Sequence, residues 1–327
     1  MASTAINNAH NITTENKKPT YSWLQSIGNN PLFSAISDYK KALNLPNPGQ
    51  YEHLHREVKN VFVSNHLVDG ARFDITKGLS PNFQVVHSFS LGSAQVPSSY
   101  NFISLYADEN IFLQGSVDNE GSLSARAHTS ETQDLRAKAH AQISNQPGHS
   151  MLQLEGEYVA SDCTLNAKVI NPGVTDNTGI ALCSILQSVT PNLALGAEAI
   201  FQRPTTEIEE SSISYVAKYA TPKSVLTANF QQPGLVQASY FHKVNDMAEF
   251  GVELQALVAQ GKRDAACTLG AKFDFVKSTF RTQIDTTGRV SAVLEERLAP
   301  SLTLTLSGDL DHLKGQSKFG IGLQINS

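Results

Sequence analysis

The sequence predicts an all-β transmembrane barrel of about 19 strands, and two observations support this fold class. Apolar and polar residues alternate over 135–143, where Arg136, Lys138 and His140 separate aliphatic residues. Successive side chains of a strand point to opposite faces, so this segment has one apolar and one charged face. The pattern restarts repeatedly from about residue 61 to residue 325, and no apolar run reaches the ~18 residues that a membrane-spanning helix needs. A barrel with lipid outside and a wet lumen inside accounts for both observations.

The turns between the alternating runs set the number of strands. A barrel strand that spans a membrane needs about 9–11 residues, so a strand with its turn takes roughly 13–15 residues. The region 61–325 then holds about 18–20 strands. We expect Val61 and Val63 to open the first strand. Turn-forming residues separate later runs at 118–121, 145–148, 286–288 and 309–315.

The charged residues indicate which face of each strand meets lipid. Arginine or lysine on the lipid face near the middle of the bilayer costs about 2–4 kcal/mol. A register slip of one residue would place both Arg136 and Lys138 there. We therefore expect the charges to face the lumen and the intervening alanines to face lipid.

Composition excludes several classes of function. The 327 residues carry a formal net charge of −5, which argues against a nucleic-acid-binding protein that neutralises phosphates. The three cysteines, Cys163, Cys183 and Cys267, are far apart and odd in number, so no disulfide framework is expected. The chain contains no nucleophile-elbow, dinucleotide-binding, P-loop or zinc-protease motif. We expect no enzymatic activity, no cofactor and no metal site.

The region before the barrel divides into a tail and amphipathic helices. Residues 1–28 are rich in Asn, Thr, Ser and Ala, which predicts a disordered tail. The sequence of residues 29–60 predicts amphipathic helices. The second of these helices covers 50–59 and has Leu54 and Val58 on one side. The pattern allows these helices to lie in the lumen or on a membrane surface. Residues 61–325 then form the barrel and residues 326–327 a short tail. The first helix has an apolar face formed by Leu32, Phe33, Ile36 and Leu43.

Acidic residues on the predicted lumen face are the best candidates for a functional site. Bases lie on the same face, and the signs are partly segregated along the chain, with bases at 126–138 and acids at 153–157 and 249–253. The acids either pair with bases across neighbouring strands or attract cationic passengers. Weak, repeated contacts in water and salt would suit a channel whose cargo must leave. The candidate acids are Glu155, Glu157, Glu198, Glu249, Glu253, Asp274 and Glu295.

The last strand carries a more specific pattern. Residues 318–325 follow the order polar-x-Gly-x-x-hydrophobic-x-hydrophobic, and this order ends two residues before the C-terminus. It resembles the β-signal with which mitochondrial outer-membrane barrels are assembled. The residues that match the pattern are Lys318, Gly320, Leu323 and Ile325.

Four further stretches make the resemblance specific to one family. They are Asn-Pro-Gly at 47–49, Gln-Leu-Glu at 153–155 with 158–162, the run 186–196 and the run 308–314. With the last strand, they resemble the channel-forming subunit of the translocase of the outer mitochondrial membrane, in its fungal form. The resemblance covers about residues 31–325.

This resemblance implies an architecture and a set of partners. It implies a 19-stranded barrel closed by parallel pairing of its first and last strands, with short N-terminal helices in the lumen and both termini toward the intermembrane space. The core would be homodimeric or higher, in contact with membrane lipid, a receptor subunit and small single-helix subunits. The passengers would be unfolded precursor proteins, whose cationic amphipathic presequences would meet the acidic and apolar patches of the lumen.

Two other interpretations stay open at this point. A general metabolite and ion porin of the outer mitochondrial membrane would share the fold. Such porins usually have a basic lumen, whereas this chain has clustered lumen glutamates at 155, 157, 249 and 253. A soluble β-rich binding or scaffold protein would show the alternation without crossing a membrane.

Overall fold

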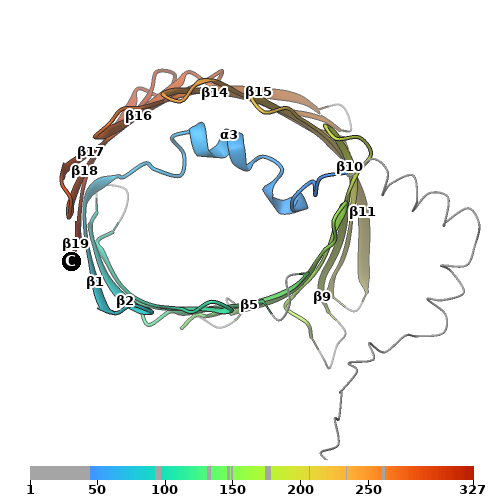
Figure 1. The fold of residues 1–327 in the computed structure, drawn as a ribbon, viewed down its shortest axis with the longest axis horizontal. Helices are drawn as coiled ribbons and strands as arrows, with labels where there is room; N and C mark the ends of the chain where they lie inside the picture. Colours follow the sequence, from blue (N-terminus) through green and yellow to red (C-terminus); the bar gives the residue numbers. More distant parts are fainter. Residues whose placement is uncertain are drawn as a thin grey trace, which may run out of the picture. The chain divides into compact units, whose positions relative to one another are not determined.

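The chain forms one closed β-barrel, which confirms the predicted fold class (Figure 1). The structure is a computed structural model. A single sheet of 19 strands makes the wall. None of the helices in the described part of the chain is long and apolar enough to span a membrane. The structure describes residues 45–92, 97–130, 134–145, 148, 150–173, 178–205, 207–232, 234–259 and 262–327.

In the described residues before β1 there are two short helices, and the strands follow one another around the barrel. The helices are the 3-10 helix η1 (Tyr51–His53) and the α-helix α3 (Arg56–Val61). The strands are β1 (Gly70–Ser80), β2 (Phe83–Leu91), β3 (Ser99–Ala107), β4 (Ile111–Asp118), β5 (Leu123–Ser130), β6 (Leu135–Ile143), β7 (Met151–Val159), β8 (Cys163–Ile170), β9 (Gly179–Ser188), β10 (Leu193–Thr205), β11 (Ile208–Ala220), β12 (Ser224–Gln231), β13 (Leu235–Asn245), β14 (Ala248–Ala259), β15 (Lys262–Asp274), β16 (Ser278–Asp285), β17 (Arg289–Ala299), β18 (Leu302–Asp311) and β19 (Gln316–Asn326).

The barrel closes through parallel pairing of β1 with β19. The register runs from Gly70 opposite Gly320 to Thr76 opposite Asn326. The other neighbours, such as β1 with β2, pair in antiparallel fashion. Since consecutive strands reverse direction, an odd number of strands leaves the first and the last running the same way. The expected parallel closure is confirmed.

Opposite faces of each strand meet opposite environments. On β7, Glu155 and Glu157 are buried, whereas Leu154 and Tyr158 are exposed. The chain before β1 crosses the barrel interior and hydrogen-bonds to Glu157, so the glutamate face is the lumen face (Figure 1). Lys138 lies opposite Glu155 in the β6–β7 register and also faces inward. The predicted assignment of charges to the lumen is confirmed on these strands.

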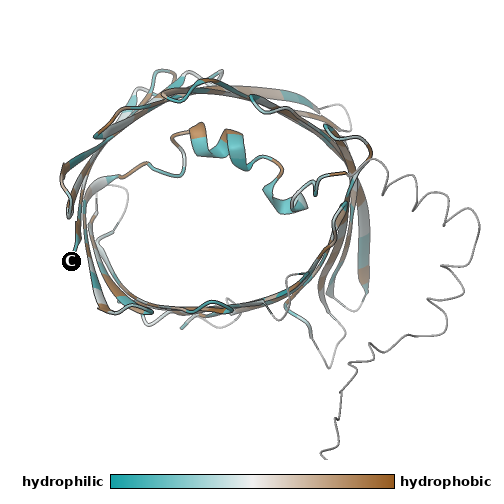
Figure 2. Ribbon diagram, viewed as in Figure 1, coloured by the Kyte–Doolittle hydropathy of each residue, from teal (hydrophilic) through white to brown (hydrophobic). Residues whose placement is uncertain are grey.

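The structure corrects the expected helix over 50–59. The segment is divided into η1 and α3, and the irregular stretch between them contains Leu54 and His55. Leu54 and Val58 are both 2% exposed, so the predicted apolar face exists. Figure 2 shows hydrophilic and hydrophobic residues together along α3. The expected helix with Leu32, Phe33, Ile36 and Leu43 and the expected tail over 1–28 lie outside the described residues.

The expected start of the barrel at Val61 was wrong. Val61 ends α3, Val63 lies in an irregular stretch, and the first strand begins at Gly70. Both valines are fully buried. The run Val-Phe-Val resembles a strand because it is apolar and β-branched, but its side chains cover the inner wall of the barrel instead of meeting lipid.

A lysine on the outer face of β7 should destabilise the barrel far more than a lysine on its inner face. We expect Leu154→Lys to cost about 2–4 kcal/mol because Leu154 faces lipid, and Gln153→Lys to cost less than ~1 kcal/mol because Gln153 faces the wet lumen. Urea unfolding of the refolded chain in lipid vesicles measures both values. Equal losses in the two variants would contradict the assignment of faces.

Candidate functional site

Residues 45–69, which we call the N-terminal segment, cross the lumen from one wall to the other (Figure 1). The segment begins against β7–β9. The side-chain amide of Asn47 donates to the carbonyl of Ala160 at 2.6 Å, and Ser188 Oγ donates to the carbonyl of Pro46 at 2.7 Å. The Asn47 side chain also accepts from the Gly49 N–H at 2.8 Å, which makes the turn expected at Asn-Pro-Gly. These bonds fix where the segment enters the barrel.

Glu155 and Glu157 hold the beginning of this segment. Lys138 Nζ lies 2.8 Å from Glu155 Oε1 and 3.7 Å from Glu157 Oε2. Gln50 Nε2 of the segment donates to Glu157 Oε2 at 2.6 Å. Lys168 bridges Glu155 to Glu52 of the segment, at 3.6 Å and 3.0 Å. Cross-strand pairing, one of the two sequence-based alternatives, therefore describes these two acids.

The two helices pack against apolar residues and glycines of the inner wall. Around η1, Tyr51 and Leu54 form a buried cluster with Leu186, Ala194 and Val216 of the wall. Under α3 the wall presents glycines on two adjacent strands. A Cβ at Gly251 would lie 3.2 Å from Val58, and a Cβ at Gly270 would collide with the ring of Phe62. Because these glycines have no side chain, the segment can lie close to the backbone of the wall.

Two of the candidate acids, Glu198 and Glu253, lie under the N-terminal segment and form no ion pair among the described residues. Glu198 makes no hydrogen bond or ion pair with any described residue. It lines a cavity of about 260 Å³ between η1 and the wall, together with Tyr51, Lys168 and Asn229. Glu253 accepts hydrogen bonds from Gln237 at 2.6 Å and Gln255 at 2.9 Å and is 8% exposed. Glu253 is therefore buried, and Glu198 is half-buried.

The other three candidate acids are more exposed. The side chains of Glu249, Asp274 and Glu295 are 21%, 34% and 28% exposed, against 4% for Glu155 and 0% for Glu157. Lys272 Nζ lies 2.6 Å from Asp274 and 3.4 Å from Glu249, so one base serves two acids. Arg281 Nη1 lies 3.0 Å from Glu295.

A recess of about 960 Å³ opens beside two of these acids. It lies at the barrel mouth where β15, β17 and β19 end. Asp274 and Glu295 line it with Lys277 and Arg297, so charges of both signs are present. Its rim includes Val276, which is 93% exposed. The recess thus combines charges of both signs with an apolar rim.

Burial changes the titration of two groups on the N-terminal segment. It raises the pKa of Tyr51 to about 12, with Glu198 adding to the effect. Burial also lowers the pKa of His55, whose Nδ1 lies 2.7 Å from Ser239 Oγ and whose Nε2 is buried without a partner. Glu253 of the wall opposes this lowering. Both side chains are therefore seated in their neutral forms at neutral pH.

The residues of the expected β-signal divide between the two faces of β19. Gly320 faces the lumen, where the chain before β1 passes over it, and Lys318 lies on the same face. Leu323 and Ile325 lie on the opposite, outer face, which follows from the alternation along the strand.

Sequence reasoning missed the wall residues that seat the N-terminal segment. Gly251 stands between Glu249 and Glu253, and Gly270 stands between Thr268 and Lys272. A glycine at a lumen position on each of two adjacent strands is a signal that could have indicated a close approach. Within the described part of the chain, Cys163, Cys183 and Cys267 form no disulfide bond.

Comparison with known proteins places the chain in a family. The sequence model of the eukaryotic porin family matches residues 47–320. The chain is 37% identical over 329 residues to mitochondrial import receptor subunit tom40 of Neurospora crassa, which covers 94% of this chain and 93% of that protein. It is 35% identical to TOM40 of Saccharomyces cerevisiae, over 93% of this chain and 87% of that protein. The chain belongs to the Tom40 family of eukaryotic porins.

Membership of the Tom40 family confirms the resemblance on which the sequence analysis rested. The homologue from Homo sapiens is 34% identical over 86% of this chain and 79% of that protein, so the relationship extends beyond fungi. The predictions of a protein-conducting channel and of a place in the outer mitochondrial membrane are confirmed. The Tom40 family is a channel family, and the metabolite porin receives no support from these relatives.

Acidification should loosen the N-terminal segment. The pKa of His55 is lowered by burial, Lys59 adds to the lowering, and Glu253 and Glu57 oppose it. The unfolded or released histidine therefore binds a proton more readily than the seated one. The free energy that holds the segment in the lumen therefore has its full value above the ordinary histidine pKa of about 6.5. It falls as the pH decreases below that value.

Hydrogen exchange of residues 45–69 at pH 7.5 and at pH 5.5, each corrected for intrinsic exchange rates, measures this effect. We expect faster exchange at pH 5.5 and a smaller difference in His55→Gln. Burial also lowers the pKa of His66, so His55→Gln with His66→Gln should show the smallest difference. Equal protection at both pH values, or an unchanged difference in the double variant, would contradict the mechanism.

Proposed function

We propose that cationic presequences of precursor proteins bind the exposed acids Glu249, Asp274 and Glu295 as they pass through this channel. The observation that carries the proposal is the division of the seven candidate acids. Four of them hold or underlie the first part of the N-terminal segment, whereas the side chains of these three are 21–34% exposed. Asp274 and Glu295 line the recess, and Glu295 also contacts the segment through His66 Nδ1 at 3.3 Å. The relatives are named import receptor subunits, which supports precursor proteins as the cargo.

Weak existing ion pairs support exchange with a passing presequence. Exposed ion pairs contribute about 0–1 kcal/mol in water. The acids that pair with Lys272 are 21% and 34% exposed, so an incoming lysine or arginine can replace Lys272 at little cost. Arg297 and Lys277 line the same recess, and the recess therefore offers alternating charges instead of one strong acidic field. Each cation of the cargo would be held briefly and then released. The apolar face of the presequence would meet the rim at Val276.

The shape of the outer wall is evidence for single-helix subunits as partners. Two apolar grooves of about 510 and 500 Å³ run over β4–β9 on the outer face. Their floor is made of small residues, including Ala139, Gly156 and Ala167. Small residues let a transmembrane helix approach a neighbouring backbone closely. We extend the proposal to small single-helix subunits, a receptor subunit, a homodimeric or higher core, and termini toward the intermembrane space.

Removal of the exposed acids should weaken presequence binding. We expect Glu249→Gln with Asp274→Asn to raise the concentration of a cationic presequence peptide that half-blocks the channel by about 2–30-fold, since each of the two contacts contributes about 0.2–1 kcal/mol. The cation preference should fall in the same variant. Single-channel recording of the full chain in a planar bilayer measures both properties.

Glu155→Gln with Glu157→Gln is the matched control, because it removes the same charge from acids that a passing peptide does not reach. We expect it to change the block much less than the first variant does. A scrambled, non-helical peptide of equal charge distinguishes presequence binding from simple charge attraction. Equal block of both double variants, or an anion-preferring channel that ignores the peptide, would sink the proposal.

A further inference from the structure

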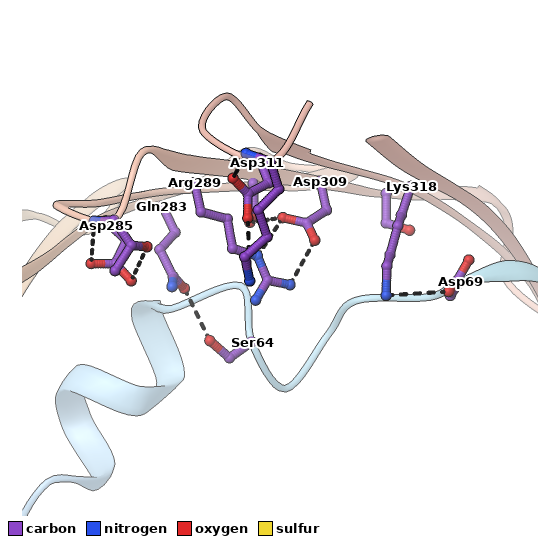
Figure 3. A network of polar contacts seen from close by, with 12 residues as sticks. Ser64, Asp69, Gln283, Asp285, Arg289, Asp309, Asp311 and Lys318 are labelled. Atoms are coloured by element: carbon purple, nitrogen blue, oxygen red, sulfur yellow. Dashed lines mark hydrogen bonds and ion pairs between the residues drawn. The ribbon is translucent and has the colours of Figure 1, made fainter. Parts of the chain in front are cut away.

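Residues 62–69 of the N-terminal segment, which we call the strap, follow the inner wall of β16–β19 before β1 begins (Figure 3). Gln283 Oε1 on β16 accepts from the Val63 N–H at 3.1 Å and from Ser64 Oγ at 3.2 Å. His66 Nδ1 lies 3.3 Å from Glu295 on β17. The strap thus contacts one strand after another toward the seam of the barrel.

The tightest contact lies on β18 and β19, next to the seam. Ser307 Oγ donates to the carbonyl of Val68 at 2.6 Å and lies 3.2 Å from the Val68 nitrogen, whose N–H it accepts. A Cβ at Gly320 would collide with the carbonyl group of Val68. At Gly322, two residues along the same face, a Cβ would meet only side-chain atoms, at 3.3 Å from Thr305 and 3.6 Å from Val68. Gly320 is therefore the position at which the wall must lack a side chain.

Charge directs the end of the strap to the last strand. Lys318 lies opposite Asp309 in the β18–β19 register, but Asp309 is already held by Arg289 through hydrogen bonds of 2.6 and 2.7 Å and by Ser291 at 2.7 Å. Lys318 Nζ instead lies 3.8 Å from Asp69, the last strap residue (Figure 3). The chain then turns into β1 at Gly70, whose φ of +77° is a left-handed conformation that favours glycine.

We propose that Ser307 and Gly320 are positioning residues that form a binding site for the backbone of Val68 and so fix the N-terminal segment in the lumen. Seating of the segment is coupled to closure of the barrel, because the same strand, β19, supplies Gly320 to the strap and pairs with β1. Lys318 and Gly320 consequently serve the finished barrel as well as the assembly step expected from the sequence pattern. This site is distinct from the proposed presequence contacts and does not depend on them.

The test measures seating directly in the full chain. Ser64→Cys and Gln283→Cys, in a background with Cys163→Ala, Cys183→Ala and Cys267→Ala, place a thiol on the strap and one on the wall. The chain is refolded into lipid vesicles, and a short bifunctional maleimide crosslinks the two thiols when the strap is seated. The reporter removes the contacts of Gln283 with Val63 and Ser64 equally from every variant compared.

We expect Ser307→Ala to lower the ratio of seated to released strap about tenfold, because it removes both hydrogen bonds to Val68. Ser307→Thr keeps the hydroxyl and should restore crosslinking. Gly320→Ala should lower crosslinking, and Gly322→Ala, on the same face of the same strand, should leave it close to that of the parent chain. The resistance of the folded barrel to unheated detergent shows that each variant has closed.

The variants on β18 keep the test decisive if Gly320→Ala does not fold. Parent-like crosslinking in Ser307→Ala would overturn the proposal, as would failure of Ser307→Thr to restore a loss. Equal effects of Gly320→Ala and Gly322→Ala would also overturn the role given to Gly320. Since no peptide is present, a failure here is separate from a failure of presequence binding.

Discussion

The need to hydrogen-bond every backbone group inside the membrane is the constraint on which the rest of this structure depends. Lipid offers no partner to a free strand edge, so a spanning sheet must close. With 19 strands the closure is parallel, and it joins Gly70–Thr76 of β1 to Gly320–Asn326 of β19. Closure also explains the alternation along each strand, because a closed wall has one side that faces lipid and one side that faces water.

A closed wall leaves a polar interior, and burial decides what each interior charge can do. Glu157 is fully buried and would be very costly to leave unpaired, so it binds Gln50 and lies near Lys138. Asp274 is partly exposed, and its pairing with Lys272 contributes little because water screens it. The same residue type therefore anchors the N-terminal segment in one place and stays available for exchange in another. Depth of burial, more than the sign of the charge, separates these roles.

The wall could be predicted from the sequence much better than what lies inside it. Strand positions and faces follow from a two-residue repeat and from the cost of lysine in lipid, as at Lys138. That reasoning failed at Val61 and Val63, because an apolar run that covers the inner wall has the same composition as one that meets lipid. It also could not show that Glu155 is occupied and Asp274 open, since pairing depends on which part of the N-terminal segment passes each strand.

The terminal pattern shows how two requirements are combined in one strand. Leu323 and Ile325 lie on the outer face of β19, where lipid requires apolar side chains but sets no upper limit on their size. Lys318 and Gly320 lie on the inner face, where a wet lumen would accept almost any polar residue. Neither contact with lipid nor contact with water therefore explains why residue 320 is a glycine. The carbonyl of Val68, which occupies the space of a Cβ, supplies the missing constraint from within the chain itself.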